Sequence, residues 1–308
     1  MKIQTPNIVL MIKPVSFNSN EQALKSNFFS TSLQLSPKNI QEQALKEFND
    51  LKKAIESIGI RVLVLEDTLN PSKPDAIFSN HWISFHENGL VGVYPMQSSV
   101  RRLERRDDVF DLIDKEIGDV VNDVIDYTDA ELNEVYLEGS GSIVLDRQNK
   151  IAYCSQSCRS NEDLFIEFCE DFDYDPVFFK ANQNINGSVK PVYHTSLLLF
   201  IGTKFAILCS DVINDKKEKK NIIQHLKKSN KEILFISEAQ MKSFSANVLE
   251  FNTKNGLVLF MSKTSLLSLS EDQIKFLNNY VKIEEVSLGT IEAVGGASVR
   301  SLVTDVFW

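Results

Sequence analysis

The sequence has few cysteines, no long apolar run and no excess of positive charge, and each absence excludes a class of protein. Four cysteines in 308 residues do not make the disulfide framework of a small secreted domain. No apolar run is long enough to span a bilayer, and the N-terminal residues lack the small-residue cleavage site of a secretory signal. We therefore expect a soluble, cytoplasmic protein.

The balance of charge argues against two kinds of partner. The chain has 33 basic and 42 acidic residues, a net charge of −9, so neither nucleic acid nor an anionic membrane is favoured. The basic runs Arg101–Arg106 and Lys216–Lys220 fall on predicted helices. We expect both runs to lie on solvent-exposed faces of these helices.

Metal and nucleotide sites also lack their usual sequence signals. Cys154 and Cys158 are separated by three residues instead of the two common in zinc sites, and no second ligand pair follows. Small buried thiols explain these cysteines more simply. No glycine-rich phosphate-binding loop follows a predicted strand. The residues themselves therefore predict neither a metal site nor a nucleotide site.

The sequence does contain a unit repeated four times, in which two strands joined by a tight turn precede a helix and a third strand. The four predicted hairpins start 59, 56 and 51 residues apart and span Trp82–Met96, Gly141–Ser155, Leu197–Ser210 and Val248–Ser262. The Asn-Gly pair in the first turn is the strongest short hairpin signal. The helices are expected over about 101–117, 162–172, 217–228 and 271–280, and the third strands over 124–127, 176–179, 233–236 and 282–286.

A fifth unit is divided between the two ends of the chain. Residues 7–13, 38–58 and 61–65 read as a strand, a helix and a strand, and residues 299–307 supply the missing piece. The repeat predicts an α/β fold, a five-bladed ββαβ propeller with pseudo-fivefold symmetry, formed by a single domain over residues 1–308. An open α/β sheet with coincidental spacing is the alternative.

One polar residue stands just before the first strand of each complete unit: Asp75, Glu138, His194 and Asn247. In a symmetric fold these four positions meet at one place. Two carboxylates there can accept the paired N–H bonds of a guanidinium or ureido group, and an imidazole suits proton transfer near neutral pH. Taken singly, such a carboxylate is more often a turn former, and such a histidine is more often a core residue.

Three other features bear on this pocket. His81 and His86 are alternatives to the histidine above as the proton-transfer group. The sequence from Ser298 to Asp305, after Gly295 and Gly296, resembles the start of a helix. Backbone N–H groups at such a helix start would stabilise a developing anion.

Six linked segments, in order along nearly the whole chain, carry a resemblance to a known family: PDAIFSNHW, YPM followed by RRLERR, LEGSGSIVLDR, VYHTS, FSANVLEF and GGASVR. Together they resemble the pentein superfamily of guanidino-modifying enzymes, which includes amidinotransferases and arginine deiminases. The nearest branch is that of the citrulline-utilisation hydrolases. The resemblance implies a five-bladed ββαβ propeller, which matches the units found above.

The resemblance also implies roles for particular residues. It implies that Asp75 and Glu138 hold the substrate's guanidinium or ureido nitrogens, that His194 is the general acid and base, and that no metal or organic cofactor takes part. A further set of candidates for substrate binding is Asn80, Asn247, Arg159 and Arg300. Either arginine could instead pin a loop.

The chain departs from the family pattern at the nucleophile. Where the family has a cysteine after glycine, serine and arginine, this chain has Ser301, and a hydroxyl is a weak nucleophile without a closely placed base. Ser196 stands where the family has Asp or Asn, and His81 stands where the citrulline branch has Asn. Cys154 and Cys158 belong to the second unit and are not expected to replace the missing thiol.

Two interpretations of function follow. In the first, the protein hydrolyses a C–N bond of an arginine- or citrulline-like compound, with Ser301 as a weak nucleophile or an artificial substitution. In the second, it is a catalytically impaired pseudoenzyme that binds such a ligand. A third interpretation is an interaction module in which the pocket no longer binds a ligand. The retained carboxylates argue against this interpretation. The expected partner is a small molecule; the oligomeric state is open, with a homodimer as one possibility.

Overall fold

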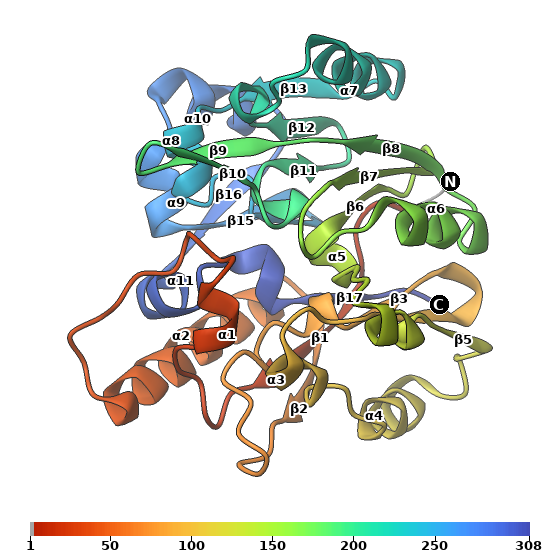
Figure 1. Ribbon diagram of the computed structural model, residues 1–308, viewed down its shortest axis with the longest axis vertical. Helices are drawn as coiled ribbons and strands as arrows, with labels where there is room; N and C mark the ends of the chain where they lie inside the picture. The colour runs from red at the N-terminus through yellow and green to blue at the C-terminus, as the bar shows by residue number, and fades with distance from the viewer. Residues whose placement is uncertain (1–2) are drawn as a thin grey trace.

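The computed structural model describes residues 3–308, and its strands form five three-stranded sheets of one topology (Figure 1). In each sheet the first strand pairs antiparallel with the middle strand, and the last strand pairs parallel with it. The sheets are β17 (Thr304–Val306), β1 (Ile8–Lys13) and β2 (Arg61–Glu66); β3 (Ile83–Phe85), β4 (Leu90–Val93) and β5 (Asp123–Asp126); β6 (Ile143–Asp146), β7 (Ile151–Ser155) and β8 (Asp175–Phe179); β11 (Leu199–Ile201), β12 (Phe205–Leu208) and β13 (Glu232–Phe235); and β14 (Leu249–Thr253), β15 (Gly256–Ser262) and β16 (Lys282–Val286).

The predicted fifth unit is confirmed. Strand β17 pairs antiparallel with β1, and Leu10 lies opposite Thr304, so both ends of the chain belong to one sheet. Strand β1 pairs parallel with β2 over its whole length. The predicted turn of the first hairpin is also confirmed, because Asn88 and Gly89 adopt the positive φ angles of 64° and 69° that this sequence favours.

A helix joins the middle strand to the last strand of every sheet. These helices are α2 (Pro37–Ser57), α4 (Asp108–Ile117), α6 (Glu162–Asp171), α7 (Lys216–Lys228) and α10 (Glu271–Asn278). In Figure 1 they lie toward the outside of the molecule, whereas α5 (Gly139–Ser142) lies near its middle. In four of them a side chain at the N-cap accepts a hydrogen bond from the first turn, as Ser36 does for α2.

Short helical turns stand directly before the first strands and lie close to one another. Helix α5 contacts both η1 (Ser79–His81) and η4 (Thr195–Leu197), and η1 contacts η6 (Val299–Leu302). These turns come from four different sheets. The residues beside them, although far apart in sequence, are therefore brought to one place.

Two predicted helices differ from those in the structure. The expected helix over 101–117 is divided into α3 (Ser99–Arg102) and α4, and Arg101, expected on a solvated face, is only 2% exposed. The expected helix start at Ser298 is only the short turn η6, because Thr304–Val306 pair with β1 instead. Long-range strand pairing outweighs the local preference there.

Several short elements were not expected from the sequence. A two-stranded hairpin pairs β9 (Asn182–Ile185) with β10 (Ser188–Pro191). The remaining helices and turns are α1 (Glu21–Leu24), η2 (Glu87–Gly89), η3 (Thr128–Asn133), η5 (Ser210–Val212), α8 (Glu238–Lys242), α9 (Lys263–Ser268) and α11 (Gly289–Gly295). In the part of the chain that the structure describes, no helix has the length and apolar character needed to cross a membrane.

Candidate active site

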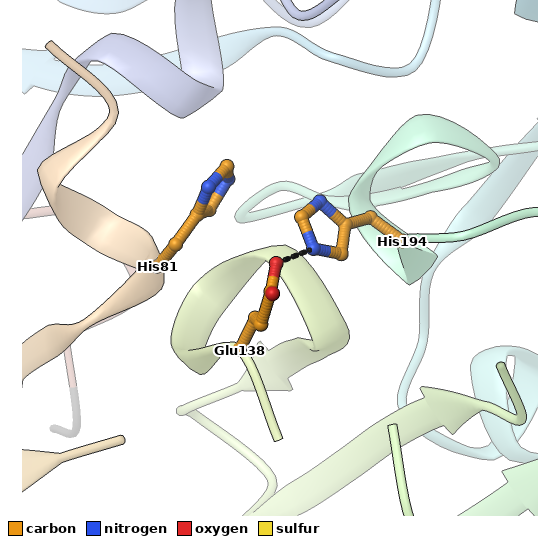
Figure 2. A group of neighbouring side chains, drawn as sticks. All are labelled: His81, Glu138 and His194. Atoms are coloured by element: carbon orange, nitrogen blue, oxygen red, sulfur yellow. Dashed lines mark hydrogen bonds and ion pairs between the residues drawn. The ribbon is translucent and has the colours of Figure 1, made fainter. Parts of the chain in front are cut away.

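The centre of the site is a hydrogen bond between the carboxylate of Glu138 and the imidazole of His194 (Figure 2). The Glu138 Oε2 and His194 Nε2 atoms are 2.8 Å apart, and both side chains are buried. Glu138 is the N-cap residue of α5, and His194 is the N-cap residue of η4. The contact between these two turns therefore brings together residues that the sequence predicted would meet.

Two guanidinium groups keep Glu138 ionised. Its Oε2 atom lies 3.3 Å from Arg159 Nη1 and 3.9 Å from Arg101 Nη1, and its Oε1 atom accepts a hydrogen bond from the backbone N–H of Gln97. Burial alone would raise the pKa of this carboxyl. The pKa is nevertheless well below its usual value, because Arg159 and the hydrogen bond from His194 outweigh the cost of burial.

Asp75 lies on the other side of Arg101. Its Oδ2 atom accepts a hydrogen bond of 2.8 Å from Asn20 Nδ2 and is 4.0 Å from Arg101 Nε. Burial raises the pKa of Asp75, and Arg101 opposes that shift only in part. Asp75 is therefore the carboxylate of the site that most needs a further hydrogen-bond donor.

Arg101 is a site residue that the sequence did not predict. Its guanidinium is buried between Asp75 and Glu138, donates hydrogen bonds of 2.9 and 2.8 Å to both oxygens of Glu104, and donates to the backbone carbonyl of Phe78. Burial raises the pKa of Glu104 to about 7, although Arg101 opposes this shift. The spacing of Arg101 and Glu104 is that of an ordinary surface ion pair on a helix, so nothing in the sequence indicated that they are buried.

Arg101 also determines the protonation of His81. Its Nη1 atom is 2.7 Å from His81 Nδ1, and because a guanidinium has no acceptor, the imidazole Nδ1 must accept this bond. Burial, together with the neighbouring His194 imidazole and Arg101 guanidinium, holds the pKa of His81 well below its usual value. His81 is therefore neutral and carries its proton on Nε2.

His194 is neutral in the same tautomer, with its proton on Nε2. Burial lowers its pKa to about 4, although Glu138 opposes the shift. Because the ionised Glu138 can only accept, His194 Nε2 donates to it, and His194 Nδ1 keeps a free lone pair. At neutral pH the imidazole is therefore a base with a fixed orientation.

Gly141 lies against both imidazoles. A Cβ atom at this position would lie 2.8 Å from His81 Cδ2 and 2.8 Å from His194 Nδ1, closer than real Cβ contacts allow. The rings are in edge contact, with centroids 4.5 Å apart. The Cδ2–Nε2 edge of His81 and the Nδ1 edge of His194 thus face the same small region, which any residue other than glycine would fill.

These residues do not fit a metal ion. His81, Glu138 and His194 each place one ligand-type atom within 4.8 Å of the others. However, His81 Nε2 carries a proton, its Nδ1 lone pair accepts from Arg101, and Glu138 Oε2 already faces two guanidinium groups. A divalent cation at this place would meet two fixed positive charges and only one free imidazole lone pair.

Ser301 is buried near the site but is bonded elsewhere. Its Oγ atom lies 3.3 Å from Asn247 Oδ1 and donates to it. Asn247 Oδ1 also accepts from the backbone N–H of Ser298, and Asn247 Nδ2 donates to the carbonyl of Ser196. Within residues 3–308 no hydrogen bond joins Ser301 to His194. The amide of Asn247 therefore ties the 298–301 turn to η4.

The expected anion-stabilising N–H groups are already used inside the protein. The backbone N–H of Ser298 donates to Asn247 Oδ1, that of Arg300 to the carbonyl of Asn247, and that of Ser301 to the carbonyl of Ser298. The expectation of free donors at these three residues is therefore wrong, for the same reason that the helix start is absent.

The other predicted residues fall into two groups. Arg159 belongs to the site, since it binds Glu138 and lies over the ring of Tyr193. Arg300 forms a two-bond ion pair with Asp305 and lines a different cavity, so it pins a loop. Asn80 is buried in η1, where its Nδ2 atom donates to the backbone carbonyl of Arg300.

Comparisons with known proteins identify a family and a fold. Residues 13–308 match the family model described as N,N dimethylarginine dimethylhydrolase, eukaryotic. None of the curated proteins matches the chain.

Among solved structures, the N-terminal domain of ArgZ, an arginine dihydrolase of the ornithine–ammonia cycle in cyanobacteria, is similar in a substrate-bound form. The TM-score is 0.73 at 16% identity, over 97% of this chain and 98% of that domain. The match to the whole ArgZ chain covers 40% of its length. The enzyme DDAH from Pseudomonas aeruginosa, in complex with citrulline, is similar with a TM-score of 0.63 at 13% identity, over 97% and 99% of the two chains.

These likenesses show an α/β fold shared with pentein structures, and the match to the family model covers nearly the whole chain. The chain therefore belongs to the N,N-dimethylarginine dimethylhydrolase family, within the pentein superfamily of enzymes that modify arginine and other guanidino compounds.

Proposed function

We propose that this protein hydrolyses a C–N bond of a small guanidino or ureido compound related to arginine or citrulline. The observation that carries the proposal is the buried Glu138–His194 hydrogen bond of 2.8 Å, with Asp75 nearby on the far side of Arg101. A carboxylate that needs a donor and a neutral imidazole with a free lone pair suit the N–H groups of such a ligand. The family match supports this class of chemistry.

In this proposal each residue has a defined task. Asp75 accepts hydrogen bonds from ligand nitrogens, and Glu138 holds His194 in the tautomer that leaves Nδ1 free. His194 Nδ1 takes a proton from the attacking hydroxyl group and passes it to the departing nitrogen, which leaves as ammonia or an amine. The attacking group is either a water molecule or the Ser301 hydroxyl. In the second case a water molecule, deprotonated by His194, then attacks the same carbon, breaks its bond to Ser301 Oγ and restores the hydroxyl. Since His194 has a pKa of about 4, nearly all of it is in the basic form at neutral pH.

A catalytically impaired pseudoenzyme is the second candidate, and one observation favours it. The hydroxyl of Ser301 donates to Asn247 at 3.3 Å and makes no hydrogen bond to His194 among the described residues. A serine without a base is a poor nucleophile, and loss of a nucleophile costs on the order of 10⁶ in kcat in a serine protease. The same residues would then bind a ligand without turnover.

One experiment separates the two candidates. Ammonia release is measured with the wild-type protein, Ser301→Cys and Ser301→Ala on a panel of arginine, citrulline, agmatine and methylated arginines. Hydrolysis through Ser301 predicts activity in the wild type, a gain with cysteine and a loss with alanine. If wild type and Ser301→Ala are equally active, water is the attacking group. If only Ser301→Cys is active, the natural protein is a pseudoenzyme with the rest of the machinery intact.

Binding at Asp75 has its own test. Titration calorimetry of Asp75→Ala should show a loss of affinity for the ligand that the wild type binds best. Glu66→Ala is a matched control, because Glu66 is an exposed carboxylate at the end of β2 paired with Lys13. Unchanged affinity in Asp75→Ala would remove this residue from the ligand site.

We also propose that the five sheets close into a five-bladed propeller in a single domain. Contacts of β17 with β3 and of β6 with β11 support this arrangement, because they join neighbouring sheets at their first strands. A crystal structure with one pair of neighbouring sheets separated would refute the closed ring.

A further inference from the structure

We propose that His81 is a specificity-determining residue, which donates a hydrogen bond from Nε2 to the carbonyl oxygen of a ureido ligand. The site would then prefer a citrulline-like ligand to an arginine-like ligand of the same shape. This inference rests on the proposed function, since it assigns the ligand class of the same pocket.

The first step is the direction of the hydrogen bond between Arg101 and His81. The Arg101 Nη1 to His81 Nδ1 distance is 2.7 Å, and a guanidinium can only donate. Arg101 is itself fixed by Glu104, whose two oxygens accept from its Nε and Nη2 atoms. Arg101, which cannot be deprotonated, therefore acts as a positioning residue that sets the tautomer of His81. In this tautomer the Nε2 atom of His81 is the hydrogen-bond donor.

The second step is that this donor has no partner. His81 is 2% exposed, and its Nε2 atom makes no hydrogen bond to any residue within 3–308. A buried donor without a partner is unfavourable, and in native proteins such groups are rare and are concentrated at functional sites. The Cδ2–Nε2 edge of His81 faces the region over Gly141, beside the free Nδ1 lone pair of His194. The two imidazoles come from two different elements and lie on either side of Glu138 in the view of Figure 2.

The third step matches this pattern to a ligand group. A guanidinium offers N–H donors alone, so it could satisfy His194 Nδ1 and Asp75 but would direct an N–H toward the N–H of His81. A ureido group has the same planar shape and offers one oxygen acceptor and several N–H donors. It offers an acceptor for His81 and donors for His194 and Asp75. A site that hydrogen-bonds one polar group strongly rejects an analogue that lacks it, because its own buried group stays unpaired.

The test compares citrulline and arginine, which differ in the ureido and guanidino groups alone. By titration calorimetry with the wild-type protein, we expect citrulline to bind roughly ten times more tightly, the usual effect of one buried hydrogen bond. In His81→Phe the citrulline affinity should fall by about the same factor while that of arginine changes little, and His81→Asn, which keeps an N–H donor, should recover part of the loss.

Nitrogen NMR on the wild-type protein gives a second readout that does not depend on a variant folding. His81 should show the Nε2–H tautomer, and its Nε2 proton should shift downfield with citrulline and not with arginine. His225, half-buried on α7, is the internal control that should not respond.

Three results would overturn the inference. Equal or tighter binding of arginine, or an unresponsive His81 proton with citrulline bound, would reject the role of His81 and leave the proposed function standing. Binding of neither compound at millimolar concentration would reject both.

Discussion

Replacement of Glu138 by glutamine should destabilise the protein strongly at neutral pH. The side chain is fully buried and its Oε2 atom receives His194 at 2.8 Å and Arg159 at 3.3 Å, while Arg101 lies at 3.9 Å. Glutamine keeps the shape but removes the charge, so Arg159 loses its carboxylate partner in the interior. Breaking one side of a buried ion pair costs about 3–5 kcal/mol in the free energy of unfolding.

The effect should depend on pH in a direction that the structure determines. The folded pKa of Glu138 lies below its unfolded value near 4.5. The stabilisation from the ionised carboxylate is therefore complete above that unfolded value and is lost as the pH falls toward the folded value. The difference between wild type and Glu138→Gln should be largest at pH 7 and should shrink steadily below about pH 4.5.

Urea unfolding at a series of pH values measures this difference. Glu66→Gln is the matched control, because Glu66 pairs with Lys13 at 2.7 Å on the surface with 63% of its side chain exposed. Exposed pairs contribute about 0–1 kcal/mol, so the control should change little at any pH. A loss below 1 kcal/mol in Glu138→Gln, or a loss that does not shrink in acid, would refute the assignment of Glu138 as a buried, ionised partner of Arg159.

Three further predictions concern other features. Gly141→Ala should lower the free energy of unfolding by about 1–3 kcal/mol, because its Cβ atom would lie 2.8 Å from the rings of His81 and His194. Gly289→Ala is the control and should be close to neutral, because a Cβ atom there meets nothing within 4 Å. Equal effects of the two substitutions would contradict the packing argument. NMR titration should show His194 gaining its proton only near pH 4, and a midpoint above 6 would contradict its burial. In the native protein one thiol, the exposed Cys158, should react rapidly with a disulfide reagent and all four after denaturation; rapid reaction of more than one native thiol would contradict the burial of the others.

The repeat made much of the fold predictable. Short strands around Asn88-Gly89 and around residues 147–150 were located because turn residues and β-branched runs act locally. The helix α2 was located because Phe48, Leu51 and Ile55 fall on one face. The pairing of β17 with β1 was predictable because the two ends of the chain each carry part of the repeated unit, and together they complete a fifth one.

Burial of charge was the part that the sequence could not reveal. In the sequence, Arg101 and Glu104 look like a solvated ion pair on a helix face. In the structure they are buried, because turns from other parts of the chain cover them. For Asp75, Glu138 and His194, equivalent positions in a repeat were enough to predict that they converge. The repeat gave no such signal for Arg101, because this residue follows a second strand and does not stand before a first strand.

The site draws on side chains from Asn20 to Ser301, and the edge of β1 is paired by residues 304–306. During synthesis on the ribosome, β2 can pair with one edge of β1 early, but the other edge must stay unpaired until residues 304–306 emerge. Until then Asp75, Arg101 and Glu138 have no closed interior in which to balance one another. A variant that lacks residues 304–306 should consequently be a target for chaperones and proteases.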